Sequence, residues 1–401
     1  MSEKLIIRNF GPIKDIELEL KKFNVIIGEN ATGKSIVAKV LAVCKYFSYI
    51  KGTNVIEAQN RSCFLGGLVS WGLEEFLKDD SYIYYECKDY SIEVKNENIE
   101  KNKYPLTTFI PTLKPLSKEF KSLLNELDKI MPSQENPDST SLMWTAPTSF
   151  FQNDVAAVLD NPFYLPTERG LQSIFSLGKS SIQNISDSLF NQFANLDLIA
   201  KNFKNETIIE PLRISYKNID GRGYIKKDNE EKFYSLYNGA SGYQSGIPVV
   251  LVIKYYNDLR KKKKTFLIEE PELNLFPSAQ KELINYLIQD GINNGNTFLL
   301  TTHSPYILTS LNNLMYAFEI GQKEPEEANK IIDKNYWINP KEVSAYRLLS
   351  DGTSGKTSKN IISSDEDGTL IRAEEIDEVS TQLNKEFDKL ISLEIQNADK
   401  E

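Results

Sequence analysis

Apolar and polar positions alternate over the first part of the chain, which predicts strands. Residues 5–10 and 16–20 show the period of two expected of half-buried strands, and Gly11-Pro12 between them predicts a turn. Residues 23–27 form a short apolar run that ends in a glycine, which is typical of a strand buried in a parallel sheet. Apolar residues at helical spacing then predict a helix from Ser35 to about Ile50.

The middle of the chain has a less uniform pattern. Alternating positions over residues 82–94 predict a hairpin, and apolar residues three and four apart predict an amphipathic helix over 116–130. Residues 132–150 are rich in Pro, Ser, Asn and Thr and indicate a loop. Residues 161–166 are expected to be extended.

The second half of the chain alternates between strand and helix patterns. Residues 171–204 are predicted to be mainly helical, and a hairpin is expected around Gly221-Arg222. From Gly239 to about residue 310 the pattern is loop, helix, strand, helix, strand, helix. Residues 365–401 are acidic and carry an apolar stripe, which predicts a docked C-terminal helix.

Composition and charge restrict the functional classes. The chain has 401 residues and a formal net charge of −9, which argues against a uniformly basic nucleic-acid binder. The single histidine, His303, excludes zinc sites built on two imidazoles. No C-x-x-C pair, long apolar leader or run of ~18 apolar residues is present. We therefore expect a cytoplasmic protein with reduced thiols and no membrane association.

Residues 28–35, Gly-Glu-Asn-Ala-Thr-Gly-Lys-Ser, match the phosphate-binding pattern G-x-x-x-x-G-K-[ST] between a predicted strand and a predicted helix. The glycines let backbone N–H groups turn towards phosphate oxygens, and the helix N-terminus adds partial positive charge. Lys34 is placed to reach the β- and γ-phosphates, and Ser35 to ligate Mg²⁺. The pattern predicts a P-loop NTPase.

Two further apolar runs end in side chains suited to nucleotide hydrolysis. Residues 265–268 are followed by Glu269 and Glu270, and residues 297–302 are followed by His303. In a parallel sheet, ligands lie at the carboxyl ends of the strands. Glu269 fits a role near Mg²⁺, and Glu270 fits a general base for the attacking water. A neutral His303 imidazole is suited to contact a γ-phosphate oxygen and hold that water.

A fourth segment, residues 238–246, is a Gly/Ser-rich turn before a predicted helix, which is another potential anion site. By itself this turn is a weak signal, since a linker would have the same composition.

In this order, the four segments resemble the ATPase head of ABC-type proteins. More narrowly, they resemble the RecF/SMC/OLD branch of ABC-like ATPases, which includes AAA-family ATPases of bacterial anti-phage defence systems. Residues 240–244, Ala-Ser-Gly-Tyr-Gln, align with the family's Leu-Ser-Gly-Gly-Gln signature. Glu269 stands where most members have Asp, and Phe276 where many relatives have His. Residues 164–170 also look like a recurrent segment of the branch.

The resemblance implies an α/β fold of the P-loop NTPase type: an ABC-type ATPase head with a mixed β-sheet flanked by helices, plus an inserted α+β lobe. The resemblance covers about residues 1–60 and 160–350, which form the discontinuous head. Residues 61–159 would form an inserted hairpin and helical lobe. Residues 171–235 would be a helical and hairpin insertion, and residues 351–401 an acidic C-terminal helical tail.

The resemblance also implies that two heads enclose two ATP molecules with Mg²⁺, so that a homodimer or higher homo-oligomer is expected. The phosphate loop of one subunit would face Ser241 and Gly242 of the other. The implied site residues are Glu270 and His303 for catalysis, Ser35 and Glu269 for the metal, and, for ATP, Gly28, Asn30, Gly33, Lys34, Ser35, Ser241 and Gly242.

Two biological roles remain open on the sequence. In the first, the ATPase controls a partner effector, such as a nuclease or toxin encoded nearby in a bacterial defence system. In the second, it is a RecF-like clamp on duplex DNA in repair, with basic clusters at Lys261–Lys264 and Lys226-Lys227. The acidic net charge favours the first. A transporter head, a coiled-coil chromosome organiser and a nuclease with an added metal domain fit the length and pattern less well.

Overall fold

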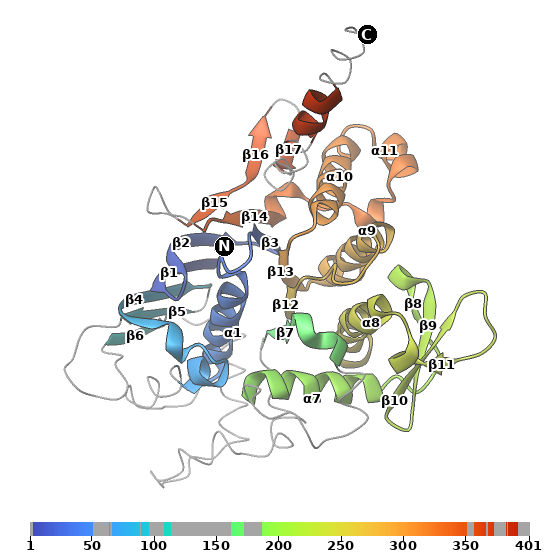
Figure 1. The fold of residues 1–401 in the computed structure, drawn as a ribbon, viewed down its shortest axis with the longest axis horizontal. Helices are drawn as coiled ribbons and strands as arrows, with labels where there is room; N and C mark the ends of the chain where they lie inside the picture. Colours follow the sequence, from blue (N-terminus) through green and yellow to red (C-terminus); the bar gives the residue numbers. More distant parts are fainter. Residues whose placement is uncertain are drawn as a thin grey trace.

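The computed structural model describes residues 3–50, 64, 66–88, 90–95, 108–113, 162–171, 187–350, 357–365, 368–372, 382 and 384–391. A six-stranded sheet, in the order β15-β14-β3-β13-β12-β7, lies at the centre (Figure 1). Its strands are β3 (Phe23–Gly28), β7 (Phe163–Leu165), β12 (Thr265–Glu269), β13 (Thr297–Thr302), β14 (Val343–Leu348) and β15 (Ser358–Asn360). Neighbouring strands are parallel except β14 and β15.

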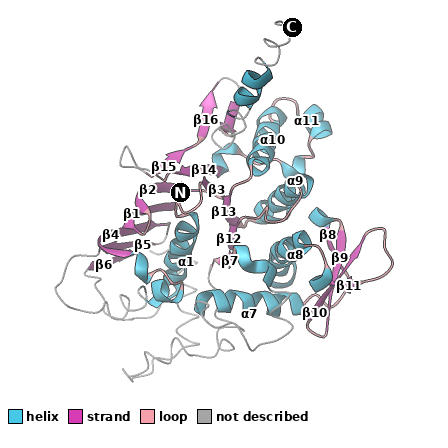
Figure 2. Cartoon of the chain, in the orientation of Figure 1, coloured by secondary structure: helices cyan, strands magenta, loops and turns pink. Residues whose placement is uncertain are grey.

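Helices cover both faces of this sheet (Figure 2). Helix α1 (Lys34–Ile50) packs on one face against β3, β12 and β13. The other face is covered by α7 (Asp187–Lys201), α8 (Ser241–Lys254), α9 (Pro277–Tyr286) and α10 (Pro305–Gly321), with α11 (Pro325–Ile331) beside α10.

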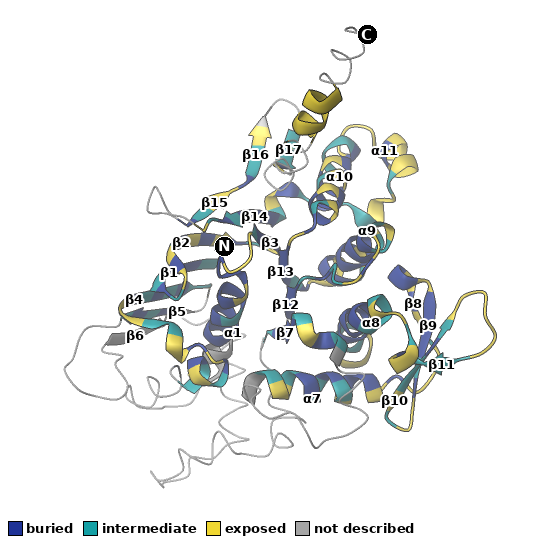
Figure 3. Ribbon diagram, in the orientation of Figure 1, coloured by how far each residue is buried: buried dark blue, intermediate teal, exposed yellow. Residues whose placement is uncertain are grey.

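Burial on both faces explains why the central strands read as continuous apolar runs. On β12, Phe266 and Ile268 join the core under α8, α9 and α10, whereas Leu267 joins the core under α1. Successive side chains of a strand point to opposite faces, so a strand covered on both sides needs apolar residues throughout. Figure 3 shows this buried centre between exposed outer helix surfaces. The predicted parallel strand at 23–27 is confirmed as β3.

A second sheet lies on the far side of α1. It has the order β2-β1-β4-β5-β6, with β1 (Glu3–Phe10), β2 (Ile13–Leu20), β4 (Leu77–Glu86), β5 (Tyr90–Lys95) and β6 (Thr108–Leu113), and all its pairs are antiparallel. The predicted hairpins at 5–20 and 82–94 are both present. The second does not form a lobe of its own, because β4 pairs with β1 and extends the N-terminal sheet. The predicted helix 116–130 and loop 132–150 lie outside the described residues.

A third, smaller sheet packs beside α7 and α8. It has the order β11-β10-β9-β8, with β8 (Thr207–Ile209), β9 (Ile214–Ile219), β10 (Arg222–Lys227) and β11 (Tyr234–Ser235). The predicted hairpin around Gly221-Arg222 is confirmed as β9 and β10. Of the predicted helical stretch 171–204, residues 187–201 form α7, and residues 172–186 lie outside the described residues.

The C-terminal segment differs from the sequence prediction of a docked helix. Strand β15 completes the central sheet, and β16 (Ile362–Asp365) and β17 (Gly368–Ile371) form a hairpin beside α10. Ile371 is buried there, and its backbone N–H donates to the Asn312 side chain while its carbonyl accepts from it. Helical structure is described at 384–391, where Phe387 and Leu390 are 62% and 63% exposed, so this helix does not dock.

No helix among the described residues is both long and apolar enough to cross a membrane.

A substitution at Phe298 can test the contribution of the central core to stability. It is fully buried, with its ring centroid 5.3 Å from that of Phe266 and 5.7 Å from that of Phe23. We expect Phe298→Ala to lower the free energy of unfolding by about 3–5 kcal/mol because it removes these contacts and leaves a cavity. Phe276→Ala is the control: Phe276 is 77% exposed, and a change within about 0.5 kcal/mol is expected. Urea unfolding of both variants measures the difference, and similar losses would contradict this description of the core.

Candidate functional site

The phosphate-binding pattern forms a tight loop between β3 and α1. Gly33 has a φ of +97°, a conformation that side chains disfavour, and a Cβ there would lie 2.9 Å from Ile13. The Thr32 hydroxyl donates to the Glu29 carbonyl at 2.9 Å, which closes the loop on itself. Asn30 and Ser35 are exposed, and Lys34 is the first residue of α1. The loop thus places the unpaired N–H groups of a helix N-terminus at the carboxyl end of β3.

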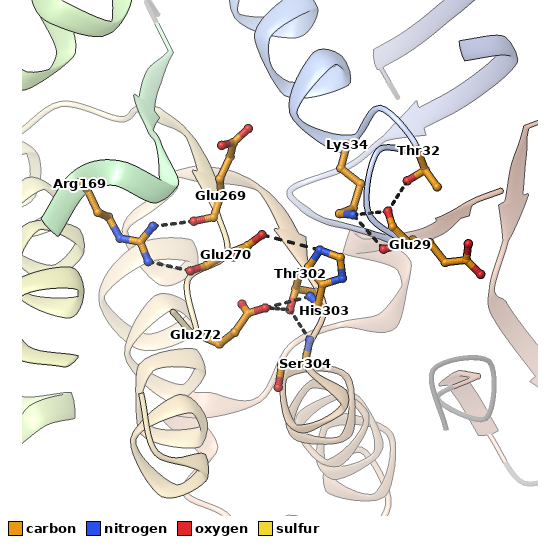
Figure 4. A network of polar contacts seen from close by, with 11 residues as sticks. Glu29, Thr32, Lys34, Arg169, Glu269, Glu270, Glu272, Thr302, His303 and Ser304 are labelled. Atoms are coloured by element: carbon orange, nitrogen blue, oxygen red, sulfur yellow. Dashed lines mark hydrogen bonds and ion pairs between the residues drawn. The ribbon is translucent and has the colours of Figure 1, made fainter. Parts of the chain in front are cut away.

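The Lys34 ammonium is held inside this loop. Its Nζ donates to the carbonyls of Gly28 and Glu29, each at 2.8 Å. Burial lowers the pKa of Lys34, while the charges of Glu270, Glu269 and Glu272 act in the opposite direction. The ammonium lies on the side of the loop that faces the carboxylates at the end of β12 and in the turn after it (Figure 4).

Register brings the ends of four strands to one edge. Leu165 on β7 pairs with Ile268, Glu269 with Thr301, and Thr302 with Ile27. The segments after these strands therefore meet there, and Figure 4 shows them together.

Glu269 is the last residue of β12 and is 4% exposed. Its Oε1 atom is buried and makes no hydrogen bond of good geometry; the hydroxyl of Tyr164 on β7 also makes none, although it lies close to the Glu269 carboxylate. Burial, with the nearby Glu269 charge, raises the pKa of Tyr164 well above its usual range, so the phenol stays protonated. An unpartnered buried carboxylate oxygen carries a desolvation cost that a cation would remove, which suits a metal ligand.

Glu270 begins the turn after β12 in an unusual backbone conformation. Its φ is +42°, in the left-handed region, which costs a non-glycine residue about 1–3 kcal/mol. The Glu270 side chain is partly exposed, and its Oε1 lies 3.7 Å from Nε2 of His303. The strained turn thus presents one carboxylate to the imidazole at the end of the neighbouring strand.

Glu272 ties this turn to the histidine strand. Its Oε1 accepts from the Thr302 hydroxyl at 2.7 Å and from the His303 N–H at 2.9 Å. The Thr302 hydroxyl in turn accepts from the Ser304 N–H at 3.0 Å. Glu272 therefore fixes the backbone that carries His303.

Arg169 lies behind the same turn, in a short 3₁₀ segment (Thr167–Leu171) that follows β7, and it is fully buried. Its guanidinium donates to four backbone carbonyls, those of Pro166, Ser245, Glu269 and Glu270, at 2.6–3.0 Å. Burial lowers the pKa of Arg169 to about 10, and the Glu272, Glu270 and Glu269 charges counteract this effect. The side chain thus keeps its charge at neutral pH.

The Gly/Ser-rich turn begins α8, where Ser241 is exposed and Gly242 half-buried. It packs against the far part of the acidic turn: a Cβ on Gly242 would lie 2.7 Å from the Asn274 carbonyl. The Ser245 hydroxyl donates to the Leu273 carbonyl at 2.7 Å. Within this chain, Ser241 and Gly242 therefore lie beside residues 273–275, and the carboxylates and His303 lie nearer the phosphate loop.

The sequence predicted most of the side chains in this cluster, but not the residues that hydrogen-bond to the backbone beside them. Lys34, Glu269, Glu270 and His303 meet as the alternation of strands and motifs predicts. The motifs predict no role for Arg169, which lies in the segment 164–170, or for Glu272, which lies two residues after Glu270. One available signal was an arginine four positions after the end of the short apolar segment 163–165.

Comparison with known proteins then adds a family match. The AAA ATPase domain family matches residues 1–65 and 74–308. Comparison with curated proteins gives no match.

Among solved structures, the chain resembles an SMC head domain from Thermotoga maritima (11% identity, TM-score 0.38, covering 77% of this chain and 91% of that one). It also resembles an Smc head bound to the C-terminal winged-helix domain of ScpA (13%, 0.46, 93% and 99%). A third similar structure is an Smc head with an extended coiled coil bound to the ScpA C-terminal domain, derived from Pyrococcus furiosus (10%, 0.41, 96% and 99%). At these identities and TM-scores the likenesses add nothing to the family match.

The two hydrogen bonds to Glu272 can be tested by stability. We expect Glu272→Leu to lower the free energy of unfolding by about 1.5–3 kcal/mol, because the Thr302 hydroxyl and the His303 N–H lose a charged acceptor. Glu272→Gln keeps one carbonyl oxygen as acceptor and should lose less. Urea unfolding compares the variants, and equal losses would show that these hydrogen bonds are not the source of the stabilisation.

Proposed function

The chain belongs to the AAA ATPase domain family, and from that premise we propose that it hydrolyses Mg-ATP at the shared carboxyl edge of β3, β12 and β13. The observation that carries the proposal is the meeting of three motif residues at this edge. Oε1 of Glu270 lies 3.7 Å from Nε2 of His303. His303 follows β13, which pairs with β3, the strand before Lys34, and Glu270 follows β12, which pairs with β13. ATP as substrate also implies that the protein acts in the cytoplasm.

The phosphate loop is suited to hold the triphosphate. Gly28, Asn30, Gly33 and Ser35 contribute backbone groups of the loop and of the first turn of α1. The carbonyls of Gly28 and Glu29 hold the Lys34 ammonium within the loop, so a charged donor is already in place for β- and γ-phosphate oxygens.

Two residues fit the magnesium ion. The unpartnered Oε1 of Glu269 and the exposed Ser35 hydroxyl at the start of α1 are oxygen donors of the kind that Mg²⁺ accepts. When bound, the ion would neutralise charge on the phosphate oxygens.

Glu270 and His303 divide the chemical step. The Glu270 carboxylate takes a proton from water, the water oxygen bonds to the γ-phosphorus, and the bond from that phosphorus to the ADP oxygen breaks. The His303 imidazole, a partly exposed group held beside Glu270, orients the water or donates to a γ-phosphate oxygen.

We expect Glu270→Gln to lower the hydrolysis rate by about 10²–10⁴-fold, since a general base is removed, while ATP binding persists. The variant should therefore accumulate as an ATP-bound dimer. Phosphate release and light scattering with ATP measure the two effects. Lys34→Ala is the control, because loss of the loop cation should weaken nucleotide binding and prevent the dimer. An unchanged rate in Glu270→Gln would reject this role for Glu270.

The position of the Gly/Ser-rich turn, residues 238–246, supports the proposed dimer. Ser241 and Gly242 begin α8 beside residues 273–275, and Ser241 is exposed. A helix N-terminus with exposed N–H groups favours an anion, here the γ-phosphate held by a second copy. Two copies related by a two-fold axis would complete two such sites.

We further propose that this nucleotide-dependent dimer controls a partner effector, of the nuclease or toxin class, in a bacterial defence system. The charge distribution supports a protein partner over duplex DNA. Lys226 and Lys227 form ion pairs with Glu206 and Glu230, and Lys264 is buried over the Tyr256 ring. Lys261, Lys262 and Lys263 are exposed, but they precede β12 and so lie at its opposite end from Glu270. No observation specifically favours the RecF-like DNA clamp.

The choice of partner can be tested with the Glu270→Gln variant. We expect it to retain the product of a neighbouring gene in pull-downs when ATP is present, and Lys34→Ala to lose that product. Binding to a DNA duplex is measured in parallel over a range of salt concentrations. Duplex binding that falls steeply with salt, without an ATP-dependent protein partner, would favour the clamp instead.

A further inference from the structure

We propose that Arg169 is a positioning residue for hydrolysis, which holds the Glu270 turn in its strained conformation so that the carboxylate faces His303. The inference rests on the proposed role of Glu270 as general base. It begins from the placement of a full charge in the core: Arg169 is fully buried, and its guanidinium donates four hydrogen bonds to backbone carbonyls.

The four carbonyls belong to three segments that are far apart in the sequence and adjacent in the fold. Pro166 follows β7, Ser245 lies in the first part of α8, and Glu269 and Glu270 end β12 and begin the acidic turn. The two shortest contacts, 2.6 Å to Glu269 and 2.7 Å to Glu270, go to the two successive carbonyls of the acid pair. A planar guanidinium with several fixed donors suits such a cluster better than a single ammonium group does.

The hydrogen bonds from Arg169 matter most for the backbone conformation of Glu270. Its φ of +42° is unfavourable for a residue with a side chain and persists only where surrounding contacts enforce it. Three hydrogen bonds do so: the Glu270 N–H donates to the Thr301 carbonyl at 2.8 Å, and the Glu270 carbonyl accepts from Leu273 N–H and from Arg169. Arg169 is the one side chain among these partners, so it is the one that substitution can remove.

This arrangement predicts an effect on the chemical step and not on nucleotide binding. Arg169 touches the carbonyls behind the turn, whereas the phosphate loop is closed by its own bonds from Thr32 and Lys34. If the Glu270 turn relaxes, the carboxylate moves away from the water it must deprotonate. A displacement of about 1 Å from a reactive geometry can cost about 10²-fold in rate.

The first test is Arg169→Lys, which keeps the positive charge but loses the fork of donors. We expect its kcat to fall by roughly tenfold to a hundredfold while KM for ATP changes by less than about threefold. Arg222→Lys, at an exposed position on β10, is the matched control and should behave as the native chain. An unchanged kcat in Arg169→Lys, or a loss confined to KM, would overturn the assignment.

The second test combines the variant with Glu270→Gln. If Arg169 acts through Glu270, then Arg169→Lys should lower the residual rate of Glu270→Gln by less than about threefold, because the group being positioned has already been removed. A further loss of tenfold or more would show that Arg169 acts by another route. A Glu270→Gln variant that hydrolyses at the native rate would instead reject the proposed function, so the two failures are distinguishable.

Folding is monitored by the thermal transition and by binding of a fluorescent ATP analogue. Should Arg169→Lys not fold, Arg169→Gln, which has two amide donors and no charge to bury, takes its place under the same criteria. If neither variant folds, Arg169 serves the fold as a whole and the positioning assignment falls.

Discussion

Parallel pairing of β3, β13, β12 and β7 is the constraint on which the rest of the structure depends. In a parallel sheet every strand presents its carboxyl end at the same edge, so segments far apart in the chain must meet there. This requires that the strands be buried on both faces, and the chain satisfies that requirement with apolar residues that alternate between two cores. The nucleotide chemistry therefore rests on burial of residues such as Phe298 and Leu267, which touch no substrate.

The same edge of the sheet also brings several charged side chains together, and carboxylates there lie near cations that offset their charge. Glu269, Glu270 and Glu272 lie near two cations, Lys34 and Arg169, whose pKa values are lowered by burial while these carboxylates act to raise them. Backbone carbonyls complete the compensation, since both cations donate to them. Among these carboxylates, the Oε1 of Glu269 and the Oε2 of Glu272 are buried without a hydrogen-bond partner, and the first, at the end of β12, is the atom proposed to bind the metal. Neighbouring carboxylates thus have different roles: Glu272 stabilises the fold through hydrogen bonds, whereas Glu269 and Glu270 are proposed to serve the chemistry.

Much of the local structure was predictable because it follows from short-range patterns. The phosphate loop, the strands before Glu269 and His303 and the hairpin at β9 and β10 each carry their own periodicity or turn residues. The prediction for the C-terminal segment was wrong because it relied on the same short-range pattern. Ile371 fits an apolar helical stripe, but in the structure it lies in β17, where Asn312 on α10 satisfies its backbone groups. A pattern of apolar residues does not reveal a partner elsewhere in the chain. The segment 61–159 shows the same limit, because only pairing with β1 decides that β4 and β5 extend the N-terminal sheet.

By itself, the sequence determined which residue types are available for phosphate, metal and water, and it ordered them along the chain in a pattern that a P-loop ATPase requires. The tertiary structure alone decided how they are supported. Arg169 is separated from Glu269 by a hundred residues, and its guanidinium reaches that carbonyl only because β7 pairs with β12. Likewise, the positive φ of Glu270 and the hydrogen bonds of Glu272 to Thr302 and His303 depend on contacts between strands. Local propensity acts over a few residues, whereas the position of a catalytic carboxylate is set by long-range hydrogen bonds and packing.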